Sequence, residues 1–279
     1  MAKPRVVNVQ FNNEQIFFGD FANHILAEGD SWFGWAHLNL APSSNLLEEL
    51  RFEKASVVVS YAFSGDTIRN MAKLASNSAF FREIASQAYD AIMLSGGGND
   101  LIDALPFVIP TCDPAAPPAS AVDCVDTRAL DTLFDGFVIP NYRQIIGHRN
   151  AGAAPNRNTP VVIHTYDFPT ARNAPATFMG AIPAAGPWLW RALRNAGVPP
   201  QFDQQIVDRV FKRLGDALRG LHDPANHVFV VDTPGTIERA AAGTTGLSGD
   251  WINEIHPDAH GYSLLAAKLS LQLQALNLR

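Results

Sequence analysis

The chain has 279 residues, of which 47% are hydrophobic and 17% are charged, and its formal net charge is −6. A chain of this length buries roughly 75% of its unfolded surface, so it can form an apolar core without disulfide or metal support. The composition argues against a disordered chain or a solvated coiled coil. The negative charge and the absence of an apolar run of roughly 20 residues predict no nucleic-acid partner and no transmembrane segment.

Strand-like apolar runs alternate with helix-like segments along the chain. An N-terminal hairpin is expected from residues 6–11 and 15–18, around Asn12 and Asn13. Further strands are expected at 25–28, 55–63, 90–94, 160–165 and 227–232. Helices are expected at 46–52 (capped by Ser43 or Ser44), 67–88, 127–148 (broken at Pro140), 202–221 and 259–276. This alternation predicts an α/β fold with about five parallel strands and crossover helices.

Two segments rich in Pro and Ala interrupt the alternation, at 106–125 and 168–187. Both are expected to be irregular. Long irregular loops in compact proteins are usually functional or disordered, so we expect these segments to lie over the site as lids. The chain shows no internal repeat and no linker-like boundary, which predicts a single domain over 1–279.

Cys112 and Cys124 lie within the first of these segments and are the only two cysteines. No CxxC pattern is present, which argues against a zinc or thioredoxin-type site. The two thiols are either unrelated or form a disulfide that closes a short loop. The N-terminal residues lack the apolar region of a secretory signal. The chain is therefore expected to be cytoplasmic if it is complete, or exported if a signal was removed and the cysteines pair.

Small and polar residues follow the predicted strands, at the place where an open α/β sheet binds its ligands. They are Gly29-Asp30-Ser31, Ser64-Gly65-Asp66, Gly97-Gly98-Asn99-Asp100, His164 to Asp167, and Asp232-Thr233. We therefore expect the site at this edge of the sheet.

Taken singly, each of these residues also has a structural explanation. Ser31 is either a helix cap or a nucleophile, and a serine nucleophile needs a base and an oxyanion hole. Gly65 is either a turn glycine or a backbone donor that approaches a ligand closely. Asn99 either belongs to a Gly-rich turn or donates its amide to an oxyanion. A phosphate-binding loop is not supported, because neither GxxxxGK[ST] nor GxGxxG is present.

His256 precedes Pro257 and the predicted closing helix. In isolation it is explained as a surface histidine. His260 stands four residues further on, but HExxH is absent, so neither a metal nor a cofactor is expected.

These four blocks together (GDS near the N-terminus, a Gly after the second predicted strand, GxND after the third, and His-Pro before the last helix) resemble the SGNH (GDSL-type) hydrolases. The resemblance covers the chain from about Ile25 to the C-terminus. It implies a three-layer α/β/α flavodoxin-like sandwich and an esterase or lipase mechanism. The implied roles are Ser31 as nucleophile, His256 as general base, and the Ser31 N–H, the Gly65 N–H and the Asn99 side chain as oxyanion hole.

The chain departs from the family pattern at two positions. Trp32 follows Ser31 where the family has Leu, and together with Phe33 and Trp35 it adds aromatic surface. Asn253 stands three residues before His256, where the family usually has Asp. A neutral amide can orient an imidazole, although it stabilises the imidazolium less than a carboxylate would.

The third member of the triad is therefore left open. Asn253 and Asp250 are the leading candidates, and Glu254 and Asp232 are further alternatives.

The expected function is a serine esterase that acts on short-chain, aryl or acetyl esters, a small-molecule substrate. The alternative is a non-catalytic ligand-binding module on the same fold, which Asn253 keeps open. Trp32, Tyr166 and Trp251 are expected to line an apolar acyl pocket, unless they serve only in core packing. If His256 is the base, activity should rise from pH 5 to 8 as the imidazole loses its proton.

Overall fold

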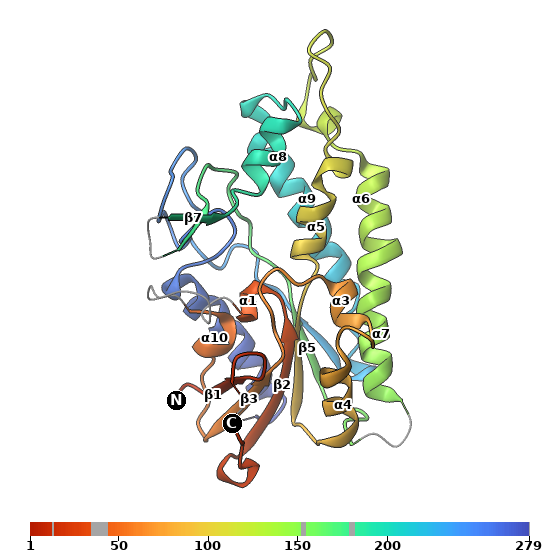
Figure 1. The fold of residues 1–279 in the computed structure, drawn as a ribbon, viewed down its shortest axis with the longest axis vertical. Helices are drawn as coiled ribbons and strands as arrows, with labels where there is room; N and C mark the ends of the chain where they lie inside the picture. The colour runs from red at the N-terminus through yellow and green to blue at the C-terminus, as the bar shows by residue number, and fades with distance from the viewer. Residues whose placement is uncertain (13, 35–43, 152–154, 179–181, 279) are drawn as a thin grey trace.

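The computed structural model describes residues 1–12, 14–34, 44–151, 155–178 and 182–278. Within them, a six-stranded parallel sheet runs through the molecule (Figure 1). Its strands, in order across the sheet, are β1 (Arg5–Asn8), β3 (Ser56–Ser60), β2 (Asn23–Gly29), β4 (Ala91–Ser95), β5 (Val161–His164) and β8 (Val228–Val231). Without β1, this order is the 2-1-3-4-5 arrangement of flavodoxin-like folds. The predicted α/β class is confirmed, with six strands instead of about five.

The expected N-terminal hairpin is wrong. β1 pairs in parallel with β3, from Arg5 opposite Val57 to Asn8 opposite Ser60, and residues 14–17 lie in no strand. An unpaired strand edge exposes backbone donors and acceptors, and β1 covers that edge of β3. The Asn8 side chain adds a hydrogen bond to the carbonyl of Ala62, at 2.9 Å. Asn13, at the expected turn, lies outside the described residues, as do Ser43 and Trp35.

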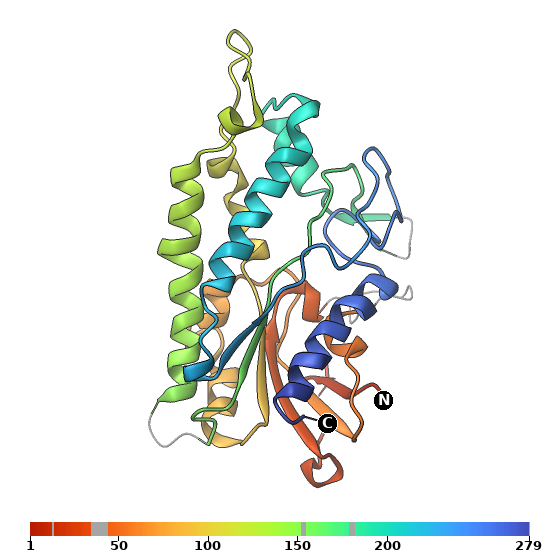
Figure 2. The ribbon, with the colours of Figure 1, turned by 180° about the vertical axis from the view of Figure 1, so that it is seen from behind.

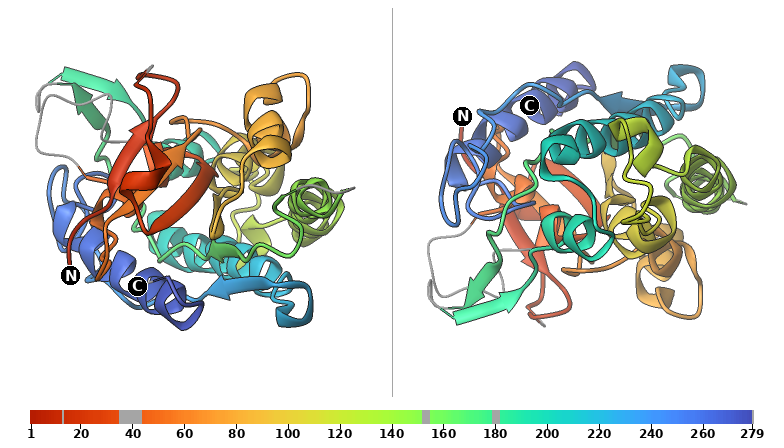
Figure 3. Two further views of the ribbon diagram at one scale, coloured as in Figure 1. Left: turned by 90° about the horizontal axis from the view of Figure 1, so that it is seen from below. Right: turned by 90° about the horizontal axis from the view of Figure 1, so that it is seen from above.

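Helices cover both faces of the sheet (Figure 3). On one face α2 (Leu46–Glu49) packs against α10 (Ala259–Ala275). On the other, α7 (Ile139–Asn150) packs against α3 (Ile68–Ala72) and α4 (Ser78–Ser86). The molecule is thus a three-layer α/β/α structure, as predicted. None of the described helices is both long and apolar enough to cross a membrane.

Three of the predicted helices differ in detail. Asn45 caps α2 by accepting the N–H of Glu48 at 3.1 Å, whereas Ser44 donates to Glu49. The expected helix 67–88 is divided into α3 and α4, and between them Asn77 donates to Glu28 at 2.8 Å. The division thus provides a partner for a carboxylate that is buried in the sheet.

The third difference concerns residues 127–148, which form α6 (Thr127–Leu133), a π-helical turn η4 (Phe134–Val138) and α7. The irregular turn ends two residues before Pro140, whose ring nitrogen has no N–H to continue the helical bonding.

A group of elements extends beyond the carboxyl ends of the strands (Figures 1 and 2). It comprises α5 (Gly98–Val108), α6, α8 (Leu189–Asn195), α9 (Asp203–Arg219) and the hairpin of β6 (Ala176–Phe178) and β7 (Ile182–Ala185). Two expectations are corrected here, because residues 106–108 still belong to α5 and the segment 168–187 contains the β6–β7 hairpin. The remaining short elements are α1 (Ser31–Gly34), η1 (Phe18–Asp20), η3 (Ala121–Cys124), η5 (Pro200–Phe202) and η6 (Pro224–Asn226).

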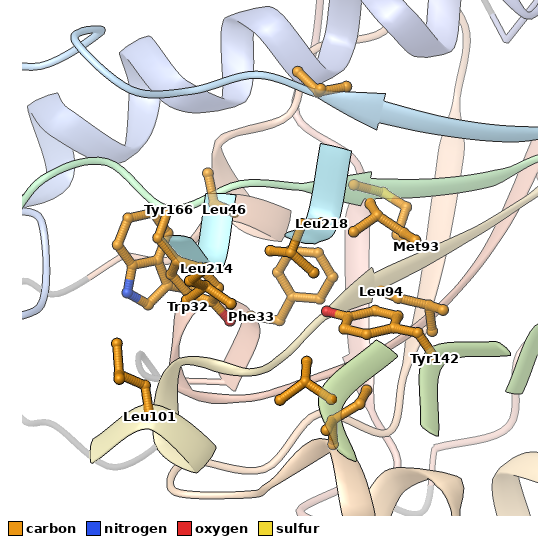
Figure 4. Packing of buried hydrophobic residues seen from close by; sticks show 14 of the residues in the cluster. Trp32, Phe33, Leu46, Met93, Leu94, Leu101, Tyr142, Tyr166, Leu214 and Leu218 are labelled. Carbon is orange, nitrogen blue, oxygen red and sulfur yellow. The ribbon is translucent and has the colours of Figure 1, made fainter. Parts of the chain in front are cut away.

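Aromatic side chains occupy the core where the sheet meets this group of elements. Trp32 and Tyr166, both shown in Figure 4, have ring centroids 4.9 Å apart and belong to the same buried cluster as Leu214 of α9. The indole of Trp32 also stacks on the imidazole of His164, at 5.6 Å. The residue after Ser31 is therefore anchored in the core.

Candidate active site

Ser31 is the first residue of α1 and directly follows β2. A Cβ at Gly29 would lie 2.8 Å from Cβ of Ser95, so only glycine lets β2 end this close to β4. Asp30 accepts the N–H of Trp32 at 3.0 Å, the hydroxyl of Ser95 at 2.8 Å and the hydroxyl of Tyr166 at 2.5 Å. Burial raises the pKa of the Asp30 carboxyl, and these donors oppose that shift. These three hydrogen bonds to Asp30 fix the turn that carries Ser31.

The structure brings Ser31 and His256 into direct contact, although 225 positions separate them in the chain. The Oγ of Ser31 lies 2.8 Å from Nε2 of His256, and both residues are buried. His256 ends a loop ahead of α10, which Asp258 caps by accepting the N–H of Gly261 at 2.8 Å. The nucleophile and base expected from the sequence are therefore at hydrogen-bond distance.

Asn253 lies behind the imidazole. Its Oδ1 is 3.0 Å from Nδ1 of His256, and it also accepts the backbone N–H groups of His256 at 2.9 Å and Ile255 at 3.1 Å. Two backbone donors that converge on one atom require that atom to be the amide oxygen, which assigns the amide orientation and the tautomer. The oxygen then accepts the Nδ1 proton and leaves the Nε2 lone pair directed at Ser31.

The carboxylates considered for this position are engaged elsewhere. Asp250 accepts from His260 Nδ1 at 2.8 Å and from the N–H of Glu238 at 2.6 Å. Asp232 forms an ion pair with Arg219 at 2.8 Å. His256 therefore contacts Ser31, whereas His260 contacts Asp250.

Burial lowers the pKa of His256 to about 3. Asn253 is neutral and adds no negative charge that would stabilise the imidazolium. His256 is therefore already in its neutral form at pH 5, and the expected rise of activity between pH 5 and 8 moves to lower pH.

The expected oxyanion residues lie beyond the ends of β3 and β4, Gly65 in a turn and Asn99 in the first turn of α5. Gly65 has φ +87°, a backbone conformation that favours glycine. Its turn is held by the N–H of Phe63, which donates to the carbonyl of Gly29 at 2.9 Å. The Asn99 amide donates to the carbonyl of Asp66 at 2.9 Å, and an amide nitrogen has a second N–H for another acceptor.

Two further features support this side of the site. The Ser31 N–H stands at the start of a helix, where no carbonyl four residues earlier in the helix can accept it. Asp100 accepts the N–H of Ile68 at 2.9 Å and thereby attaches α3 to the start of α5. Burial raises the pKa of Asp100 to about 6.

Ser31 and Asn99 line one small cavity. All three aromatic residues expected to bind substrate, Trp32, Tyr166 and Trp251, also line it. His164 lies deeper, with Nε2 2.9 Å from the hydroxyl of Ser95, and burial lowers its pKa to about 4. Asp167 accepts the N–H groups of Gly235 and Thr236, each at 2.8 Å, and so orders a neighbouring loop.

Sequence reasoning missed the role of Glu254, which it considered only as a triad carboxylate. Its buried carboxylate accepts the backbone N–H groups of Arg172, Trp188, Leu189 and Trp190, with distances of 3.2 Å to Arg172, 2.8 Å to Leu189 and 2.7 Å to Trp190. Burial raises its pKa to about 7. Glu254 thus joins the start of α8 to the loop of the base, and Trp188 contacts the His256 ring edge-to-face at 5.6 Å.

Arg172 was also missed. Its buried guanidinium donates to the carbonyls of Asn253 at 2.6 Å, Trp251 at 3.2 Å and Gly246. No local pattern distinguishes this arginine within its Pro- and Ala-rich segment. A buried arginine without nearby sequence partners is identified only when the carbonyls around it are known.

No model of a known protein family matches the chain, and neither does any curated protein. Solved structures, in contrast, match the chain. A lipase from a goat rumen metagenome is 14% identical over 92% of this chain and 98% of its own, with a TM-score of 0.55. A possible lipase from Chitinophaga pinensis is 12% identical over 92% of this chain and 100% of its own, with a TM-score of 0.57.

A structure from Slackia heliotrinireducens, described as a candidate SGNH hydrolase, is 14% identical over 90% of this chain and 99% of its own, with a TM-score of 0.40. The strand order and the likeness to the two lipase structures, whose TM-scores exceed 0.5, define the architecture. The chain shares the three-layer α/β fold of these two lipase structures, the fold that the resemblance to the SGNH hydrolases implied.

Proposed function

We propose that this protein is a serine hydrolase of carboxylic esters. The observation that carries the proposal is the 2.8 Å contact between Ser31 Oγ and His256 Nε2, with the Asn253 oxygen on the opposite ring nitrogen. A hydroxyl, a neutral imidazole and an acceptor that sets its tautomer are the parts that nucleophilic catalysis by serine requires. The names of the structural neighbours, which include lipases, agree with this class of reaction.

In the first half of the reaction, Ser31 Oγ attacks the ester carbonyl while His256 Nε2 takes the hydroxyl proton. The carbonyl oxygen becomes an oxyanion, which the N–H groups of Ser31 and Gly65 and the amide of Asn99 stabilise as donors. The C–O bond to the alcohol then breaks, and His256 returns the proton to the departing oxygen. The product is an acyl-enzyme on Ser31.

In the second half, water attacks the acyl carbon and His256 accepts one of its protons. The tetrahedral intermediate collapses, the Ser31 oxygen leaves, and His256 protonates it. His256 retains its Nδ1 proton in both halves and donates it to the Asn253 oxygen, so the imidazole always presents Nε2 to the reacting oxygen. At Nδ1, the imidazolium formed at each step faces the dipole of a neutral amide where the family pattern has a carboxylate.

The proposal is tested with a fluorophosphonate probe and a series of p-nitrophenyl esters. Wild type should be labelled and should hydrolyse at least one ester, whereas Ser31→Ala should lose both properties. Ser86→Ala, at an exposed serine of α4, is the matched control and should retain both. Labelling that persists in Ser31→Ala would contradict the assigned nucleophile. A wild type that is neither labelled nor active would support the ligand-binding module instead.

A further inference from the structure

Apolar side chains from several elements line the cavity beside Ser31, which is partly open to solvent. They are Trp32 of α1, Ile102 of α5, Phe211 of α9, Trp251 and Ile255 of the base loop, and Tyr166 and Pro169 after β5. Ser31 and Asn99 line the same cavity. An acyl group attached to Ser31, with its oxygen directed at Asn99, would therefore extend between these side chains.

The two acidic residues that line the cavity are already satisfied. Asp30 accepts hydrogen bonds from Trp32, Ser95 and Tyr166, and Asp167 accepts those of its own loop. A carboxylate with its lone pairs occupied gives little attraction to a polar acyl chain. The cavity therefore favours an apolar group.

The aromatic walls are fixed in position. The indole of Trp32 donates to the carbonyl of Ile255 at 3.2 Å and packs against the rings of Tyr166 at 4.9 Å and Trp251 at 6.3 Å. The hydroxyl of Tyr166 is bonded to Asp30 at 2.5 Å. All three aromatic residues are buried. A closely packed wall of this kind can be displaced only by breaking these contacts.

The interior of the cavity is about 20 Å³, enough for about one group of the size of a water molecule. We infer that the acyl site accepts an acetyl group and excludes longer acyl chains, so that the substrates are acetyl esters. This inference rests on the proposed serine esterase function and narrows it. The methyl group of the acetyl fills the cavity, and a further methylene finds no room inside it.

Two residues that line the cavity do not belong to the proposed catalytic groups. Ile102 is half-buried on α5, and Phe211 is 6% exposed on α9. Their replacement by alanine enlarges the acyl site and leaves Ser31, His256 and Asn99 unchanged. Suitable controls remove the same atoms elsewhere in the core, at half-buried Ile146 of α7 and at Phe81 of α4, which is also 6% exposed.

The experiment measures kcat/KM for p-nitrophenyl acetate, propionate, butyrate and hexanoate. Wild type should prefer acetate over butyrate by at least about tenfold, the discrimination that a tight apolar pocket provides against additional methylenes. Ile102→Ala and Phe211→Ala should reduce that ratio, by more in Phe211→Ala, where more volume is removed. Ile146→Ala and Phe81→Ala should leave the ratio unchanged, and thermal unfolding of each variant reports whether it is folded.

The outcomes separate this inference from the function on which it depends. Turnover that requires Ser31 but is equal for acetate and butyrate overturns the acetyl assignment and leaves the esterase intact. If the ratio of kcat/KM for acetate to that for butyrate stays the same in folded Ile102→Ala, the acetyl assignment is also overturned, even if Phe211→Ala does not fold. A wild type without fluorophosphonate labelling overturns both.

Discussion

The two halves of the candidate site are held in place by different parts of the molecule. The oxyanion half, with Gly65 in the turn beyond β3 and Asn99 in the first turn of α5 beyond β4, is positioned by the ends of two strands of the sheet. The base half, with His256 and Asn253, lies in a loop that Arg172 and Glu254 attach to residues some 60 to 80 positions away. The oxyanion half therefore follows from sheet topology, whereas the base half depends on buried polar contacts between distant segments.

The largest effect is expected from the base half. His256→Ala removes the proton acceptor of Ser31 and should lower kcat on the order of 10⁶-fold, comparable to the loss of the nucleophile in other serine hydrolases. His260→Ala is the control, because that exposed side chain binds Asp250 and should leave kcat close to wild type. Steady-state kinetics on p-nitrophenyl acetate decides between them. Near-normal turnover in His256→Ala would rule out this base.

The oxyanion half should be less sensitive, because three donors share its task. Asn99→Ala should lower kcat by about 10²–10³, the usual cost of one lost donor, with a smaller change in KM. Asn141→Ala is the control, since Asn141 is also half-buried and donates to a backbone carbonyl, that of Phe137, at 2.7 Å. If Asn99→Ala lost no more activity than Asn141→Ala, Asn99 would not be an oxyanion donor.

The pH dependence of kcat/KM should test the base half without a substitution. Since burial lowers the pKa of His256 to about 3, the imidazole is neutral throughout pH 5–8, and kcat/KM should be level there. Activity should fall only as the pH drops toward that pKa and the base becomes protonated. Circular dichroism at each pH shows whether the fold persists. A profile that rises steeply through pH 6–7 would contradict the low pKa.

Asn253→Asp should shift the fall of activity at low pH to higher pH. A carboxylate about 3.0 Å from Nδ1 of His256 stabilises the imidazolium and should raise the pKa of that histidine by about 1–3 units. Below the new pKa the variant loses its base at a pH where wild type is still active. Asn173→Asp, at an exposed position, controls for the added charge. An unchanged pH dependence in Asn253→Asp would mean that residue 253 does not contact the base during catalysis.

The smallest effect on catalysis is expected from the contacts that attach the base loop. Glu254→Gln replaces one carboxylate oxygen by an amide group that cannot accept from the N–H groups of Leu189 and Trp188. Unsatisfied buried donors of this kind cost about 1–3 kcal/mol of unfolding free energy. Urea unfolding measures that loss, with exposed Glu53→Gln as control, and kcat should fall less than in Asn99→Ala. An unchanged unfolding free energy would contradict the role of Glu254.

Most of the fold could be predicted from the sequence, because hydrophobic periodicity and glycine turns report on local structure. The N-terminal strand could not. Residues 5–8 have the same apolar pattern whether they form a hairpin or extend a parallel sheet, and the choice depends on the unpaired edge of β3. The cap of α2 at Asn45 was missed for a similar reason, since three adjacent polar residues compete for that position.

The sequence by itself determined which turns meet at the site. The carboxyl ends of parallel strands share one edge of the sheet, so Ser31, Gly65 and Asn99 were expected at one site, and the resemblance to the SGNH hydrolases implied their roles. Only the tertiary structure decided that Asn253, and not Asp250, faces the ring of His256. It alone identified Arg172 and Glu254 and the cavity walls Ile102 and Phe211. These features depend on side-chain directions and hydrogen bonds between distant segments, and such contacts leave no periodic signal in a chain.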